Sequence, residues 1–306
     1  MTTLLLSPIL VPLLGALLYW FVGWRAGTRW VAASSAVLVL AAAVAIAAGV
    51  TADGPLSGAG LLRADALSAY LLIVIGCVAV VATVATPAYL ATELVAGRLD
   101  RAACARYSVL VQAFLAVMAL AVLAANLGVL WVAIEATTVV TAFLVGQRRT
   151  RTAVEAAWKY VVISSTGIAL ALLGTFLLNY ASLHTVSLFH PDPAGLDWVG
   201  LVGAAPALDP GVTRIAVVLL VIGFGTKAGL APLHSWLPDA HSQAPAPVSA
   251  LMSGVLISVA FYAVLRVKVI ADAALGADFT RALLLVVSLA SLTIAASLIL
   301  GQRDYK

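Results

Sequence analysis

Apolar runs about as long as a membrane is thick recur from one end of the chain to the other. A helix needs about 20 predominantly apolar residues to cross a bilayer. Of the 306 residues, 63% are apolar and only 10% are charged, whereas soluble domains carry roughly a quarter charged residues. The pattern predicts an all-α polytopic membrane protein and excludes a soluble fold. The expected spans, about nine, cover residues 3–22, 29–50, 67–90, 107–125, 127–147, 156–180, 212–237, 247–267 and 281–301.

Basic residues in the connecting loops favour one orientation, because Lys and Arg collect on the cytoplasmic side. With the N-terminus outside, the inner loops hold Arg25, Arg29, Arg98, Arg101, Arg106, Arg148, Arg149, Arg151, Arg303 and Lys306. The outer loops then hold only Arg63, Arg214, Arg266, Lys268 and Arg281. We therefore expect a multi-pass protein of the cell inner (cytoplasmic) membrane with its N-terminus outside. Charge distributed in this way does not indicate a nucleic acid partner.

The stretch GFGTKAGLAPLHSWLPDAHSQAPAPVSAL, residues 223–251, places ionisable residues between two apolar runs. Lys227 falls near the middle of the span 212–237, where an ionisable residue is costly and marks a functional site by default. The ring of Pro232 removes a helix hydrogen bond and predicts a kink in this seventh span. Freed backbone at membrane depth must be buried in protein or line water. We therefore expect Lys227 to exchange protons beside a hydrated break.

The histidines of this stretch suggest a route from Lys227 to the inner surface. His234 follows Lys227 by seven residues, which is the same helical face and roughly 10 Å along the axis. A water-bridged relay between the two is expected. His241 follows Pro238 and Asp239 and is expected at the surface. A metal site from His234, Asp239 and His241 is disfavoured because Pro238 prevents a shared helical face, so no metal is predicted.

Two further ionisable residues fall within spans. Glu135 lies near the middle of the fifth span and is either a proton carrier or a protonated packing residue. Lys159 lies about one turn into the sixth span. Glu155 precedes it by four residues, which favours a helical ion pair near the membrane surface. If its side chain turns inward, Lys159 meets Glu135 instead. The residues alone leave both orientations open.

Cofactor motifs are not found in the sequence. Two cysteines cannot hold an iron–sulfur cluster, and no ligand set for haem or flavin is visible, so no cofactor and no redox centre is predicted for this chain. In GFGTKAG, Thr precedes the Lys and the context is a span, so it is not a nucleotide loop. Gly225 and Gly229 instead form a G-x-x-x-G pair, which predicts close approach of a neighbouring helix.

The segments GTKAGLAPLHSWLPDAHSQAPAPVSAL, NLGVLWVAIEATT and EAAWKYVVISSTG carry a family resemblance. The chain resembles the antiporter-like, proton-conducting membrane subunits of NADH:quinone oxidoreductase (complex I), multisubunit sodium/proton antiporters and energy-converting hydrogenases. It looks most like the hydrogenase-4 component F type. The resemblance implies that Glu135, Lys159 and Lys227 form a proton half-channel, in which the Glu135–Lys159 pair controls the charge on Lys227. It therefore favours the inward orientation of Lys159.

The family resemblance also implies a domain organisation. Relatives have about fourteen spans built from two inverted five-helix repeats, an arrangement found in other transporters. Residues 1–106 would form an N-terminal three-helix segment, 107–267 the first repeat (spans four to eight), and 268–306 the start of a second repeat. The chain stops soon after its ninth span, so the second repeat is expected to be truncated. Many respiratory relatives have a His where this chain has Ser253, which can orient water but cannot hold a proton.

The expected function is that of a proton-translocating subunit without a redox centre, inside a redox-driven complex whose other membrane and peripheral subunits are its partners. Glu135, Lys159, Lys227 and His234 would transfer protons, with Pro232, Ser253, Asp239 and His241 as auxiliary residues. Two alternatives remain. One is a sodium/proton antiporter subunit without a redox partner. The other is a non-conducting structural or assembly subunit.

Overall fold

The computed structural model describes residues 1–58, 60–184 and 195–301. Within these residues, nine helical segments are long and apolar enough to cross a membrane, which confirms the all-α polytopic fold. Arg303 and Lys306, counted above as inner charges, lie outside the described residues. The segments are α1 (Thr2–Val22), α2 (Val31–Asp53), α3 (Ala66–Val95), α4 (Arg101–Leu123), α5 (Leu127–Val145), α6 (Arg151–Leu183), α8 (Pro210–Lys227), α10 with α11 (Ala246–Leu251 and Ile257–Leu275, joined by a π-helical turn at Met252–Leu256) and α12 (Ala277–Ile299).

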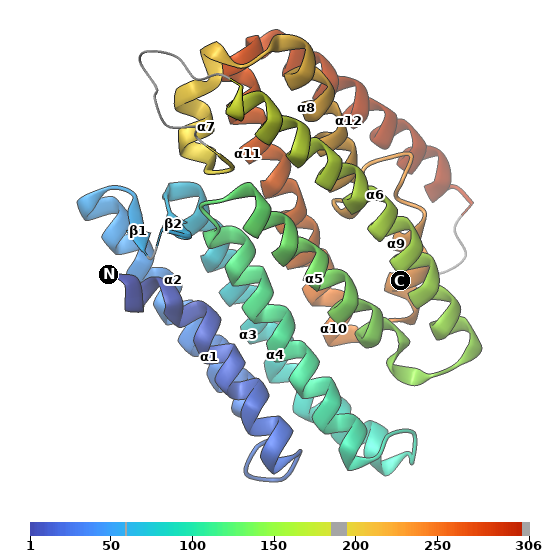
Figure 1. Cartoon of the computed structure of the whole chain (residues 1–306). Coiled ribbons are helices and arrows are strands. Elements are labelled where there is room, and N and C mark those ends of the chain that lie inside the picture. Colours follow the sequence, from blue (N-terminus) through green and yellow to red (C-terminus); the bar gives the residue numbers. More distant parts are fainter. Residues whose placement is uncertain (59, 185–194, 302–306) are drawn as a thin grey trace.

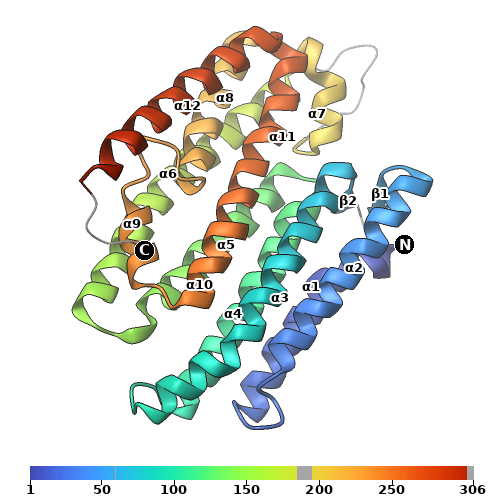
Figure 2. The ribbon, with the colours of Figure 1, turned by 180° about the vertical axis from the view of Figure 1, so that it is seen from behind.

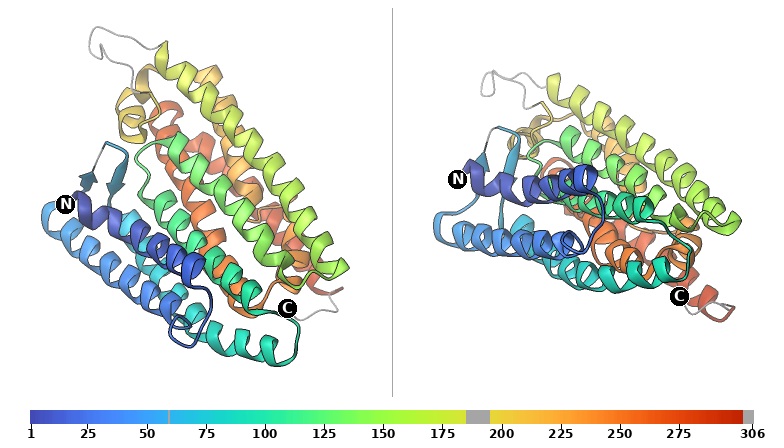
Figure 3. Two further views of the ribbon diagram at one scale, coloured as in Figure 1. Left: turned by 60° about the horizontal axis from the view of Figure 1, so that its bottom comes forward. Right: turned by 90° about the horizontal axis from the view of Figure 1, so that it is seen from below.

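The spans pack side by side in two groups (Figures 1 and 2). In the first group α1 contacts α2 and α4, and α2 contacts α3; in the second α6 contacts α5 and α8, and α8 contacts α11. Views tilted about the horizontal axis show the same grouping (Figure 3). We call the end of the bundle that carries loops 23–30, 96–100 and 146–150 the inner end, and the opposite end the outer end.

Short elements close the outer end. The hairpin of β1 (Leu56–Gly58) and β2 (Leu62–Ala64) pairs Leu56 with Ala64. A short turn joins α4 to α5 at this end. Its Asn126 side chain accepts hydrogen bonds from the backbone N–H of Gly128 and Val129 at 2.8 and 3.4 Å, and so caps the start of α5. A bridge from Asn126 to Asp197 holds the short helix α7 (Trp198–Ala204) against this turn.

A buried ion pair joins the two groups of helices at the outer end. Arg266 of α11 is 5% exposed and donates two hydrogen bonds of 2.6 Å to Asp65, the N-cap of α3. The guanidinium also lies 4.1 Å from the centre of the Trp198 ring. Burial raises the pKa of Asp65, but the hydrogen bonds and charge of Arg266 and the Ser68 amide outweigh it and lower this pKa from 3.8 to about 2. The expectation that Arg266 is a loop residue is therefore wrong.

Lys268 was likewise expected in an outer loop. It lies instead within α11 and pairs with Asp272 one turn later. The helix continues to Leu275, past the expected end of the eighth span, and this ion pair stabilises its last turns. Asp272 also accepts a hydrogen bond from Thr280 of α12 and so joins the two last helices.

Glycines bring α6 and α8 into backbone contact. A Cβ atom built on Gly223 would lie 2.6 Å from the backbone nitrogen of Ala171 and from the carbonyl oxygen of Gly167. A Cβ on Gly167 would lie 2.5 Å from the Cβ of Thr226. The expected G-x-x-x-G pair is therefore not the contact surface, since the three atoms nearest to a Cβ built on Gly225 all belong to Leu230, five residues later in the chain. Close approach of this kind fixes the position of Lys227, which follows directly.

Candidate functional site

The seventh span ends at Lys227 and is not a kinked helix over 212–237. Leu230 N–H donates to Gly225 O at 2.8 Å and Gly229 N–H donates to Thr226 O at 3.3 Å, with Gly229 at φ +74°. These two bonds form a Schellman motif, the usual way a helix ends on a glycine. Gly229 therefore makes the break assigned above to Pro232, which lies three residues beyond it.

Two side chains hold the broken segment at membrane depth. The indole N–H of Trp236, the first residue of α9 (Trp236–Gln243), donates to Thr226 O at 2.9 Å. Ser291 of α12 accepts the backbone N–H of Ala231 at 2.9 Å. Since unpaired backbone groups are costly in a bilayer, these bonds stabilise the non-helical stretch between α8 and α9. Pro232 itself is exposed.

Lys227 lies at the centre of this arrangement and is fully buried. Its Nζ donates to Ile134 O at 3.1 Å and to the hydroxyl of Thr138, both on α5. The Nζ also lies 5.5 Å from the centre of the Tyr160 ring on α6, a distance at which the ring face attracts a cation. Three groups on two neighbouring helices, α5 and α6, therefore surround one ammonium group.

Glu135 is connected to Lys227 through Thr138. The Thr138 hydroxyl donates to Glu135 Oε2 at 3.0 Å, and the Ser165 hydroxyl of α6 donates to Glu135 Oε1 at 3.0 Å. Both carboxylate oxygens thus have a hydroxyl partner. Sequence reasoning identified Glu135 and Lys227 but missed Thr138 and Ser165. The available signal for Thr138 was its position three residues after Glu135, on the same helical face.

Lys159 does not reach Glu135 in the structure. Its Nζ lies 2.9 Å from Glu155 and 2.8 Å from Asp239 of α9, and its side chain is 48% exposed. The inward orientation favoured by the family resemblance is therefore not the one observed. A cavity of about 160 Å³ at the inner end is lined by Thr152, Glu155, Ala156, Lys159, Asp239 and Gln243.

The other predicted residues occupy separate places. His234 lies in the turn before α9 and is not on a helix with Lys227. Its half-buried ring has no hydrogen-bond partner for Nδ1 among the described residues. His241 is buried rather than at the surface, and its Nδ1 lies 2.9 Å from Ser249 Oγ. Ser253 is exposed in the π-helical turn. No group of three His, Cys, Asp or Glu residues in the described part of the chain is arranged to hold a metal.

Three buried hydroxyls of the helices that contact Lys227 have no hydrogen-bond partner among the described residues: Thr141 on α5, and Tyr160 and Ser164 on α6. Buried polar groups of this kind are usually satisfied by ordered water. They lie on the two helices that carry Glu135 and Ser165. Thr141 and Tyr160 are nearer the inner end than Thr138 and Ser164, along the direction of Lys159. These positions fit a hydrated approach from the inner end.

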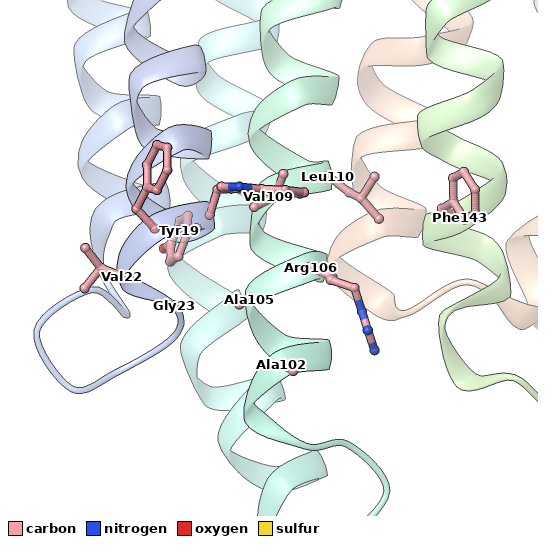
Figure 4. Close-up of a pocket in the computed structure, with 11 residues that line it drawn as sticks. Tyr19, Val22, Gly23, Ala102, Ala105, Arg106, Val109, Leu110 and Phe143 are labelled. Atoms are coloured by element: carbon pink, nitrogen blue, oxygen red, sulfur yellow. The ribbon is translucent and has the colours of Figure 1, made fainter.

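A groove between α1 and α4 lies apart from this site. It measures about 660 Å³ and is lined by apolar side chains together with Arg106 (Figure 4). None of the predicted proton-transfer residues lines it. Its apolar lining and its position at the inner ends of the helices are typical of a surface that faces lipid.

Comparison with known proteins identifies the family. Residues 124–306 match the NADH:quinone oxidoreductase/Mrp antiporter transmembrane family. The chain is 41% identical over 218 residues to the hydrogenase-4 component F homolog of Methylacidiphilum infernorum, covering 71% of this chain and 45% of that protein. It is 29% identical to the NADH-quinone oxidoreductase subunit N of Deinococcus radiodurans, covering 98% of this chain and 59% of that protein.

Solved structures show the same fold. A chain of the archaeal membrane-bound sulfane sulfur reductase superimposes with a TM-score of 0.75 at 20% identity. The match covers 92% of this chain and 56% of the reductase chain. A chain of respiratory complex I from Thermus thermophilus has a TM-score of 0.66 at 23% identity, covering 87% and 53%. The chain thus spans less than two thirds of the relatives it matches. By the match over residues 124–306, it belongs to the NADH:quinone oxidoreductase/Mrp antiporter transmembrane family.

Proposed function

We propose that this chain is a proton-translocating membrane subunit of a redox-driven complex, of the NADH:quinone oxidoreductase or membrane-bound hydrogenase type. The observation that carries the proposal is the buried Lys227, hydrogen-bonded through Thr138 to Glu135 between α5, α6 and α8. An ionisable pair is expensive at membrane depth and is retained mainly where charge moves. Similarity to respiratory and hydrogenase subunits supports the same reading.

Lys159 has a controlling part in this proposal. Ser165, which binds Glu135, follows Lys159 by six residues on α6, or roughly 9 Å along the axis. Lys159 must therefore leave Asp239 before it approaches Glu135. Because Asp239 lies on α9, directly after the break, movement of α9 would release the Lys159 ammonium. We propose that this release changes the charge balance at Glu135 and so shifts a proton to or from Lys227.

The proposal extends to place and partners. Other membrane and peripheral subunits supply the redox energy, since no redox ligand set was found in the sequence. The chain lies in the cell inner membrane with its N-terminus outside. Residues 1–106 support the channel repeat of 107–267, and residues 268–306 open a second repeat. His234 and Ser253 are proposed to contact water on the inner side, not Lys227 directly.

The test uses the assembled complex in inverted membrane vesicles. Proton uptake is followed with a pH-sensitive dye while oxidation of NADH or hydrogen is measured in the same sample. Lys227→Ala is expected to abolish uptake per electron, whereas Lys268→Ala, a lysine paired with Asp272 at the outer end, leaves it unchanged. Normal uptake in Lys227→Ala with intact redox turnover would refute the proposal.

Two further outcomes separate the alternatives. A structural subunit would tolerate Glu135→Gln without any loss of proton uptake per electron. A sodium/proton antiporter would show sodium-dependent proton movement in vesicles that receive no electron donor. The fold shared with a chain of the Mrp complex from Dietzia, at a TM-score of 0.68 and 24% identity, makes the sodium measurement worth including.

A further inference from the structure

The hydrogen bonds of Lys227 leave one route from its ammonium group to a carboxylate. Of its three N–H groups, one donates to Ile134 O and one to Thr138 Oγ1, and the ring of Tyr160 lies on a further side. Within the described residues, Lys227 forms no salt bridge with any Asp or Glu. The path to Glu135 therefore runs through the Thr138 hydroxyl.

The direction of these bonds suits proton transfer. A hydroxyl has one donor and two acceptor sites. Thr138 Oγ1 accepts a hydrogen bond from Lys227 and donates one to Glu135 Oε2 at 3.0 Å. Both hydrogen bonds therefore point from Lys227 toward Glu135. Thr138 is 1% exposed, which keeps bulk water out of this bridge. Ser165 binds the other carboxylate oxygen and leaves Oε2 turned toward Thr138.

The neighbouring threonine shows that this arrangement is specific to position 138. Thr137 is also fully buried, but its hydroxyl donates at 2.6 Å to Ile134 O of its own helix. Buried Thr hydroxyls commonly bond back to the preceding turn in this way. The Thr138 hydroxyl is directed instead to two ionisable side chains.

We propose that Thr138 is a proton relay: its hydroxyl passes a proton between Lys227 Nζ and Glu135 Oε2, an inference that rests on the proposed function. One Nζ–H bond of the ammonium breaks as a new Thr138 Oγ1–H bond forms. The original Oγ1–H bond breaks as an Oε2–H bond forms on Glu135. Lys227 becomes a neutral amine, Glu135 a neutral acid, and Thr138 stays neutral; no electrons or water are consumed. Rotation about the Cβ–Oγ1 bond resets the hydroxyl after Glu135 passes its proton on.

Thr138→Val tests the relay, because valine keeps the shape of threonine and removes only the hydroxyl. In the vesicle assay with the assembled complex, we expect the rate of proton uptake to fall on the order of a hundredfold. Thr138→Ser, which restores a hydroxyl, is expected to recover most of the rate. Thr175→Val is the matched control, since Thr175 is a buried threonine of α6 whose hydroxyl binds its own helix at Ala171 O.

Each result decides between the relay and the proposed function. Wild-type uptake in Thr138→Val, with uptake lost in Lys227→Ala, overturns the relay and leaves the proposed function standing. Equal loss in Thr138→Ser and Thr138→Val also overturns it, because the hydroxyl would then not be the cause. If the valine variant does not accumulate in membranes, Thr138→Ala provides the second hydroxyl-free chain, with the same loss expected. Wild-type uptake in Lys227→Ala overturns the proposed function and the relay together.

Discussion

Replacing Asp65 by Asn isolates the charge of the buried pair at the outer end. Asn is as good an N-cap as Asp, so the bond from the Ser68 amide to the start of α3 is kept. The charge-assisted bonds to Arg266 are lost. The pKa of Asp65 is lowered from 3.8 to about 2, and each pKa unit corresponds to about 1.4 kcal/mol. Asp65→Asn is therefore expected to lower the free energy of unfolding by about 2 kcal/mol at neutral pH.

The stabilisation by Asp65 depends on pH with a defined sign. Because the pKa is lower in the folded protein than in the unfolded chain, the stabilisation is complete above about pH 4. It is lost as the pH falls through the folded-state value of about 2. The difference in unfolding free energy between the wild type and Asp65→Asn should shrink over this range. Taking the difference cancels the titration of other carboxylates that both chains share.

Denaturant unfolding of the full chain in detergent measures this difference. Tryptophan fluorescence is a suitable signal, because the Trp198 ring lies 4.1 Å from the Arg266 guanidinium. Asp100→Asn is the matched control. Asp100 also caps a helix, with Ala103 N–H at 2.6 Å, and forms none of the salt bridges found within the described residues. Equal stability of Asp65→Asn and Asp100→Asn at pH 7, or a difference that persists at pH 2, would refute the argument.

The remaining predictions concern the two glycines that position Lys227. Gly223→Ala forces a Cβ to within 2.6 Å of backbone atoms of α6, so we expect a loss of about 1–3 kcal/mol from overpacking. Gly229→Ala places an L side chain at φ +74°, with an expected loss of about 1–2 kcal/mol. Gly203→Ala, with no atom within 4 Å of the added Cβ, is the control in the same unfolding assay. Wild-type stability in either test variant would contradict the corresponding role.

The spans and the ionisable centre were predictable because the membrane imposes them. A bilayer requires long apolar helices, and the nine expected spans agree with the observed ones apart from their ends. Lys227 was identifiable because a lysine within an apolar run is rare. Its complete burial agrees with that expectation. Both features are properties of a continuous stretch of residues, so the sequence alone is enough to predict them.

The contacts between helices were not predictable in the same way. Thr138 and Lys227 are 89 residues apart, and Arg266 and Asp65 are 201 apart. No periodicity along one helix reports which face of another it meets. The sequence therefore places Arg266 among the loop charges, and the family resemblance favours Glu135 as the partner of Lys159. The structure pairs Lys159 with Asp239 of α9 instead. Only the position of the helices in space decides these pairs.

The end of α8 was predictable from Gly229, and its position changes the chemistry expected of Lys227. As the glycine of a Schellman motif, Gly229 makes Lys227 the last residue of α8. Lys227 then belongs to the last turn of α8, where the partial negative charge of unpaired carbonyls favours a cation. Complete burial opposes the same charge. Under the proposed function, these two opposed effects act on the proton of Lys227, and a small movement of Asp239, Lys159 or Glu135 would change where that proton resides.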